Sequence, residues 1–104
     1  MARFAIVYAP EVLNHLSFID LKFHRLIQET IKQQLQHTPL AQTKNRKPLD
    51  QPAPFGATWE IRFGPDNRFR VFYEGDQAER RARVLAVGVK EKNRLRVGGE
   101  EIEL

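Results

Sequence analysis

The sequence predicts an α+β domain of two layers, in which two N-terminal helices pack on one face of a mainly antiparallel four-stranded sheet. Residues 58–63 and 69–74 alternate apolar and polar side chains, which is the period of strands with one buried face. Residues 18–36 repeat apolar side chains every four positions, as an amphipathic helix does. Gly-Pro-Asp-Asn at 64–67 supplies a turn between the two strands. The expected order is β-α-α-β-β-β, followed by a short C-terminal extended tail.

Length, composition and charge restrict the class of protein. A chain of 104 residues is expected to form one domain, residues 1–104. The absence of cysteine excludes disulfides and thiolate chemistry. No apolar run is long enough for a bilayer, and Pro10 and Glu11 interrupt any signal-peptide core, so we expect a cytoplasmic protein without a membrane partner. The net charge of +4 favours an acidic partner, such as nucleic acid or an acidic protein segment.

The first third of the chain is expected to contain one strand and both helices. Residues 3–8 are β-prone and can join an edge of the sheet. Pro10 suits the first position of a helix over 10–16, because its missing N–H needs no partner there. Ser17 is the expected N-cap of the second helix, over 18–36. The apolar stripe of that helix, which should cover the sheet, is Ile19, Phe23, Ile27, Ile31 and Leu35.

A long, proline-rich connection over residues 38–56 separates the helices from the paired strands. A loop of this length inside a compact domain is usually functional or mobile. Its basic residues Lys44, Arg46 and Lys47 directly precede the strands that carry two further arginines. They are candidate contacts for nucleic acid, and the alternative interpretation is a solvated linker.

The length of the turn determines which residues of the two strands face each other. With residues 64–68 in the loop, Arg62 stands opposite Arg70. Directly opposed like charges weaken a sheet, so an anion held between the two guanidiniums would account for the pair. The alternative is two solvated arginines that Glu60 and Glu74 partly neutralise.

The last long strand, residues 82–90, should complete an antiparallel meander. Ala86 and Gly88 leave room above the face turned away from the helices, and the tail beyond this strand can turn at Gly98 and Gly99. That face is expected to stay open and to carry Glu60, Arg62, Arg70, Phe72 and Lys90. Cations around an aromatic ring suit a phosphate flanked by a stacked base.

The three histidines are not expected to hold a metal ion. No pair among His15, His24 and His37 shows ligand spacing with nearby carboxylates. We therefore expect histidines at the surface, and neither a metal nor another cofactor.

With this order and these motifs, the sequence resembles the RelE/ParE superfamily of type II toxins over nearly its whole length. The most specific segments are Lys-Pro-Leu at 47–49, Trp-Glu-Ile-Arg at 59–62, Phe-Arg-Val-Phe-Tyr at 69–73 and Val-Gly-Val-Lys at 87–90. The resemblance implies a RelE/ParE-like fold. Toxins of the RelE type cleave messenger RNA in the ribosomal decoding site without a metal, leaving a 2′,3′-cyclic phosphate and a free 5′-OH. Such chemistry needs cations around the phosphorane and a group that moves protons.

The resemblance also implies roles for single residues. Arg70 matches the family's strand arginine, Arg62 the basic residue on the preceding strand, and Lys90 the basic end of the last strand. Those three would be catalytic, with Glu60 and Glu91 as candidates for proton transfer. The implied RNA contacts are Lys44, Arg46, Lys47, Phe72, Arg94 and Arg96.

Two departures from the family's pattern concern the chemistry. Glu60 stands where RelE itself often has a basic residue. Near the carboxyl terminus, where ribonuclease members often place Tyr or His, this chain has Glu91, Asn93 and Arg96. The residue that moves protons is therefore left open at this point.

The function implied by the resemblance is a ribosome-dependent endoribonuclease toxin that inhibits translation. Its partners would be mRNA on the ribosome and a cognate antitoxin whose acidic and apolar residues cover the basic face. One alternative is a ParE-like poison of DNA gyrase, and another is a non-catalytic binding module on the same fold. Because the paired arginines repel each other, Arg70→Ala is expected to leave the stability unchanged or slightly raised.

Overall fold

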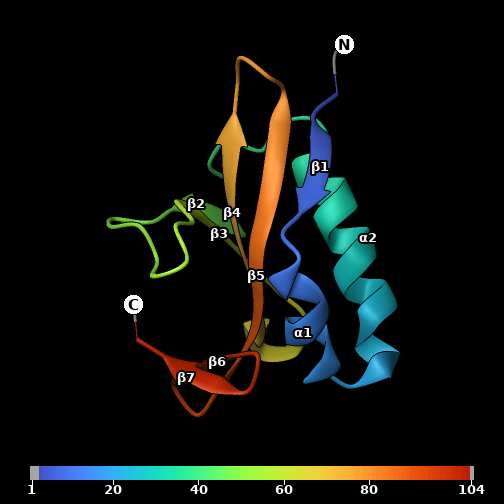
Figure 1. Ribbon diagram of the computed structural model, residues 1–104, viewed down its shortest axis with the longest axis vertical. Helices are drawn as coiled ribbons and strands as arrows, with labels where there is room; N and C mark the ends of the chain where they lie inside the picture. Colours follow the sequence, from blue (N-terminus) through green and yellow to red (C-terminus); the bar gives the residue numbers. More distant parts are fainter. Residues whose placement is uncertain (1–2, 104) are drawn as a thin grey trace.

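The computed structural model describes residues 3–103, and within them one sheet of seven strands carries α-helices on one side (Figure 1). The strands are β1 Ala5–Tyr8, β2 Arg46–Pro48, β3 Trp59–Phe63, β4 Phe69–Asp76, β5 Arg81–Glu91, β6 Arg94–Val97 and β7 Glu100–Ile102. Strands β2 to β7 are neighbours in chain order through antiparallel pairs. Strand β1 pairs in parallel with the first half of β5.

The predicted four-stranded sheet is therefore wrong, although the meander of β3, β4 and β5 and the added first strand are present. Strand β2 arises from the connection that was expected to be irregular, where it pairs with β3. The tail forms a hairpin of β6 and β7, which turns at Gly98 and Gly99 with φ of 60° and 82°. Runs of three or four residues are too short to show a side-chain period, so the backbone hydrogen bonds of a neighbouring strand decide their conformation.

Two α-helices are present among residues 3–103, α1 Glu11–Ser17 and α2 His24–Leu35. The prediction of two N-terminal helices is corrected as well, because α2 starts further into the chain than residue 18. A 3₁₀ turn, η1 Leu21–Phe23, precedes α2. In this part of the chain no helix is long and apolar enough to cross a membrane.

Side-chain hydrogen bonds explain the late start of α2. Ser17 does not cap it, because the Ser17 hydroxyl donates to the carbonyl of Asn14 at 2.6 Å. The Asp20 carboxylate instead accepts the backbone N–H of Lys22 at 3.1 Å and so caps the 3₁₀ turn. His24 Nε2 lies 2.9 Å from the carbonyl oxygens of both Leu16 and Ile19. Satisfying these carbonyls stabilises a bend where a continuous helix was expected.

The main core lies between the helices and the sheet, and the predicted stripe of α2 forms one side of it. Ile27, Ile31 and Leu35 are buried against the sheet, while Phe23 is only partly buried. The facing residues of the sheet include Ile61, Phe63, Phe69, Val71 and Tyr73. The Tyr73 hydroxyl donates to the carbonyl of Pro39 at 2.5 Å, which anchors the start of the long connection to the core.

The second face of the sheet is not open as expected. The segment between β2 and β3 folds over it (Figure 1), and a smaller core forms there around Phe72 and Ala86. The Phe55 ring packs edge-on against Phe72 at a centroid distance of 5.1 Å. Leu95 and Val97 of β6 complete this core. The part of this face that carries the charged residues borders two cavities.

A β-bulge changes the predicted faces of β5. Phe72 pairs with Ala86 but Tyr73 pairs with Val84, so Leu85 has no direct partner on β4. Val84, which was expected on the second face, therefore lies in the main core, and Leu85 contacts both cores. Beyond the bulge, Gly88 and Lys90 follow the expected alternation toward the charged part of the second face.

Candidate functional site

The site is built on the hairpin of β3 and β4, whose predicted register is confirmed. Arg62 pairs directly with Arg70, and Glu60 lies two residues before Arg62 on the same face. One Glu60 carboxylate oxygen accepts from Arg62 Nε at 2.6 Å. The other oxygen lies 3.7 Å from Arg70 Nη1. The anion that accounts for the opposed arginines is thus a carboxylate of the same chain.

Arg70 is buried and its guanidinium is held in place. Its Nε donates to the carbonyl of Asn67 at 3.1 Å. That carbonyl belongs to the β3–β4 turn, where Asp66 and Asn67 both have positive φ, of 56° and 52°. Burial lowers the pKa of Arg70, Glu60 opposes this shift, and Arg62 adds to it. Because an arginine remains protonated at neutral pH, the site keeps a fixed cation in a partly desolvated position.

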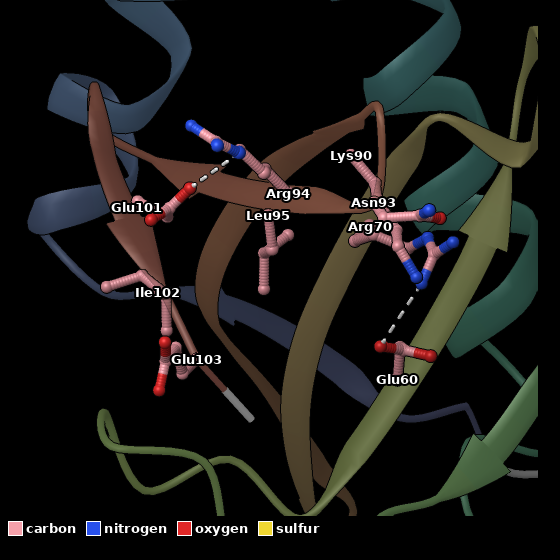
Figure 2. A pocket seen from close by; sticks show the side chains of 9 residues that line it. All are labelled: Glu60, Arg70, Lys90, Asn93, Arg94, Leu95, Glu101, Ile102 and Glu103. Atoms are coloured by element: carbon pink, nitrogen blue, oxygen red, sulfur yellow. Dashed lines mark ion pairs between the residues drawn. The ribbon is translucent and has the colours of Figure 1, made fainter.

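A cavity of about 570 Å³ opens beside Arg70 (Figure 2). Lys90 from the end of β5 and Asn93 from the following turn lie on the same side of it as Arg70. Glu101 and Glu103 line it from the direction of β7. Its further lining residues are Glu60, Arg94, Leu95 and Ile102.

A second cavity of about 900 Å³ adjoins the first at Glu60 and Glu103, which line both. Its cations are Arg62 and Lys47, and Lys47 pairs with Glu60 across β2 and β3. The proline-rich segment after β2 supplies the rest of the lining: Pro48, Leu49, Asp50, Gln51, Pro52 and Pro54, together with Gln42. We call the two cavities together the charged groove.

Six sequence-predicted residues of the candidate site meet in the charged groove, and five of them lie on strands β2 to β5. Arg62, Arg70, Lys90 and Glu60 are four of the five expected catalytic residues, and Lys47 is an expected RNA contact. They come from four neighbouring strands, β2 to β5, and share one face of the sheet. Arg94 lines the groove too, with its Nε 3.5 Å from a carboxylate oxygen of Glu101.

Two predicted RNA contacts are corrected because their side chains are buried. The Phe72 ring has no exposed surface and packs under Phe55, so it is not available to stack on a base. Arg46 is 4% exposed. Its guanidinium donates to the carbonyls of Gln34 and Ala41 and to the Thr38 hydroxyl, which ties the long connection to the end of α2. Arg46 is therefore a structural residue.

Three other candidates are exposed and lie outside the lining of the charged groove. Lys44 is part of the turn before β2, and Arg96 points from β6 on the side opposite to Leu95 and Val97. Glu91 ends β5, where it pairs with Arg94 in the register of the sheet. The geometry gives none of these three a contact with the charged groove.

The polar residues of the site that sequence reasoning missed include Asn67, Asn93, Glu101 and Glu103. Asn67 acts through its backbone carbonyl, which carries no sequence signal. Asn93 was mentioned only because it stands near the carboxyl terminus, where ribonuclease members of the family often have Tyr or His. The acidic run Glu-Glu-Ile-Glu at 100–103, directly after the Gly-Gly turn, could have indicated that carboxylates fold back onto the cationic strands.

The charged groove can bind a compact anion through Arg70, Lys90 and Arg62, with Glu60 as an internal hydrogen-bond acceptor. Residues 3–103 contain no group of three or more His, Cys, Asp or Glu side chains that could hold a metal ion. The groove offers cations that can stabilise negative charge and a carboxylate, Glu60, that can accept hydrogen bonds.

This fold is similar to that of one chain in a solved complex. The match is with the toxin–antitoxin complex RelBE2 from Mycobacterium tuberculosis, at a TM-score of 0.67 and 18% sequence identity. The likeness is one of fold. The alignment covers 85% of this chain and 99% of that chain, so nearly the whole neighbour shares the fold described here. No protein-family model matches the sequence, and no curated protein matches it.

Proposed function

We propose that this protein is the toxin of a type II toxin–antitoxin pair, and that it is a metal-independent, ribosome-dependent mRNA endoribonuclease. The fold supports the first part of the proposal, since it is shared with a chain of a toxin–antitoxin complex. The observation that carries the second part is the buried Arg70, oriented by Asn67 and Glu60 and facing a cavity with Lys90. A cation fixed before the ligand arrives stabilises developing negative charge without reorganisation.

In the proposed reaction the 2′-OH of the substrate attacks the adjacent phosphorus atom, and the bond from phosphorus to the 5′-oxygen breaks. The proton of the 2′-OH passes to the Glu60 carboxylate, and the leaving oxygen takes a proton from Lys90 or from water. Arg70 and Arg62 neutralise the equatorial oxygens of the phosphorane. For this to happen the phosphate must take over contacts that Glu60 now makes with the arginines.

A non-catalytic binding module remains the second candidate, because Glu60 already neutralises the arginine pair. The ion pairs of Glu60 with Arg62 and Arg70 are contacts that a purely structural triad would also make. On that interpretation the arginines hold β3 and β4 together, and the fold serves to bind a protein or nucleic-acid partner without chemistry.

Inducible expression with primer extension on cellular transcripts separates these functions. Cuts in register with codons, absent in an Arg70→Lys variant of normal abundance, are the expected result. DNA damage linked to gyrase, with intact transcripts, would indicate a ParE-like poison instead. Growth without either effect would favour the binding module. Co-expression of a small neighbouring reading frame that restores growth and co-purifies would identify the antitoxin.

A further inference from the structure

The charged groove contains nearly as many carboxylates as cations, although the chain as a whole is basic. Its cations are Lys47, Arg62, Arg70, Lys90 and Arg94, and its carboxylates are Asp50, Glu60, Glu101 and Glu103. A groove that receives a polyanion is expected to carry a clear positive excess. The near balance therefore requires an explanation.

Three of these four carboxylates line the cavity beside Arg70, and they belong to two different structural classes. Glu60 is buried on the sheet and ion-paired with two arginines, so it is part of the framework. Glu101 and Glu103 are exposed and belong to the last hairpin and its extension. Strand β7 spans three residues, pairs only with β6 and follows a Gly-Gly turn. A short edge strand of this kind is held by few contacts and can move at low cost.

Glu101 and Glu103 share the lining of the groove with its cations, and Glu101 makes an ion pair with Arg94 at 3.5 Å. Both line the cavity that contains Arg70 and Lys90, and Glu103 also lines the cavity of Arg62. Figure 2 shows them across this cavity from Arg70 and Lys90. Charges that line one cavity interact across it, and salt screens this interaction over a Debye length of about 8 Å at physiological ionic strength.

We infer that Glu101 and Glu103 form an intramolecular counter-anion that limits how strongly the charged groove binds nucleic acid. Their carboxylates occupy the positive potential of Arg70 and Lys90 in the free protein. An incoming strand must displace the end of the hairpin or accept its repulsion. The groove then discriminates against long polyanions and favours a short segment that offers hydrogen-bond donors to the carboxylates. This inference rests on the proposed function only in that the groove receives a phosphate.

Two double variants with the same change in net charge test the inference. Glu101→Gln with Glu103→Gln removes the counter-anion and releases Arg94 from its ion pair. Glu29→Gln with Glu79→Gln removes two carboxylates outside the groove, and it too breaks one surface ion pair, that of Arg25 with Glu29. The probes are inorganic phosphate, followed by thermal shift, and a fluorescent single-stranded RNA with 2′-O-methyl groups, followed by anisotropy at several salt concentrations.

We expect the groove variant to bind the RNA about fivefold or more tightly relative to the control variant at low salt, with the difference shrinking as salt rises. Inorganic phosphate is likewise expected to raise the melting temperature of the groove variant more than that of the control variant. Affinities of the two variants within twofold of each other overturn the inference, as does an absence of binding in both. Glu103→Gln alone repeats the test with the strand pairing of β7 untouched.

The readout is binding, so it is separate from the proposed reaction. If the groove variant gains affinity but the wild type cuts no transcript in cells, the proposed function fails and this inference stands. If transcripts are cut and the two variants bind alike, the proposed function stands and this inference fails.

Discussion

Arg62 and Arg70 are direct neighbours across the β3–β4 hairpin, and both guanidiniums make ion pairs with the carboxylate of Glu60. The pair is therefore stabilised within the chain, without any ligand. Arg70 and Glu60 are buried, whereas the side chain of Arg62 is 39% exposed. The three side chains thus contribute unequally to stability, which leads to the first prediction.

Glu60→Ala is expected to lower the free energy of unfolding by about 3 kcal/mol, because it leaves the buried Arg70 without its counter-ion. The control is Glu74→Ala, which removes the exposed partner of Arg83 and should cost less than about 1 kcal/mol. Urea denaturation of both variants measures the difference. Equal losses would show that Arg70 does not depend on Glu60.

Arg70→Ala is expected to destabilise the protein by about 1–2 kcal/mol, in contrast to the expectation from repulsion alone, because a charged hydrogen bond and an ion pair disappear. Arg70→Lys is the better functional test. A single ammonium cannot reproduce the planar contacts with Asn67 and Glu60, so we expect toxicity to be lost. Arg83→Lys, on the exposed part of β5, should remain fully toxic. Toxicity of Arg70→Lys at the wild-type level would exclude Arg70 from the reaction.

Arg46 and Lys47 are adjacent in the chain, but replacing Arg46 by alanine is expected to affect stability, whereas replacing Lys47 is expected to affect RNA binding. Arg46→Ala should lower the free energy of unfolding by about 2 kcal/mol or more, since the buried guanidinium is lost and the carbonyls of Gln34 and Ala41 lose their donor. Lys47→Ala should leave the melting temperature unchanged and weaken the binding of single-stranded RNA, because Lys47 lines the charged groove. Thermal melts and anisotropy on both variants distinguish the two roles. A stable Arg46→Ala protein would contradict the structural role.

Ile27→Ala is expected to cost about 3 kcal/mol, because Ile27 is 1% exposed in the main core. Phe23→Ala should lower the free energy of unfolding by less than the removal of a fully buried ring would, since Phe23 is only partly buried at the start of α2. The Phe23 ring packs against the Phe69 ring, with 5.0 Å between the two ring centroids. Denaturant titration gives both values. A greater loss for Phe23→Ala than for Ile27→Ala would contradict this description of the core.

His15 is expected to make the stability depend on pH. Its Nδ1 accepts the backbone N–H of Val87 at 3.3 Å, which requires the unprotonated nitrogen. Burial lowers the pKa of His15 below its usual 6.5, although Glu11 opposes the shift. The unfolded chain therefore binds the proton first as pH falls, so the stability from this group is present above about pH 6.5 and is lost below it.

Thermal melts between pH 7.5 and 5 test the His15 contribution. In His15→Asn the decrease in melting temperature over this range should be smaller than in the wild type. His37→Asn is the control, because His37 is exposed. Parallel pH profiles of the wild type and His15→Asn would show that the contact with Val87 does not respond to protonation.

The sequence by itself determined the local features of this protein. The period of two in β3 and β4 and the length of their turn are properties of consecutive residues, and they were sufficient to place Arg62 opposite Arg70. The four-residue period likewise predicted which face of α2 is buried. These predictions hold because side-chain direction follows from backbone geometry within one element.

Only the tertiary structure decided what surrounds that arginine pair. The burial of Phe72 and the structural role of Arg46 depend on the segment between α2 and β3 folding back onto the sheet. The carboxylates of Glu101 and Glu103 reach the groove through a hairpin whose strands are too short to show a period. Contacts between residues far apart in the chain are fixed by packing and backbone pairing, and local sequence periodicity carries no record of them.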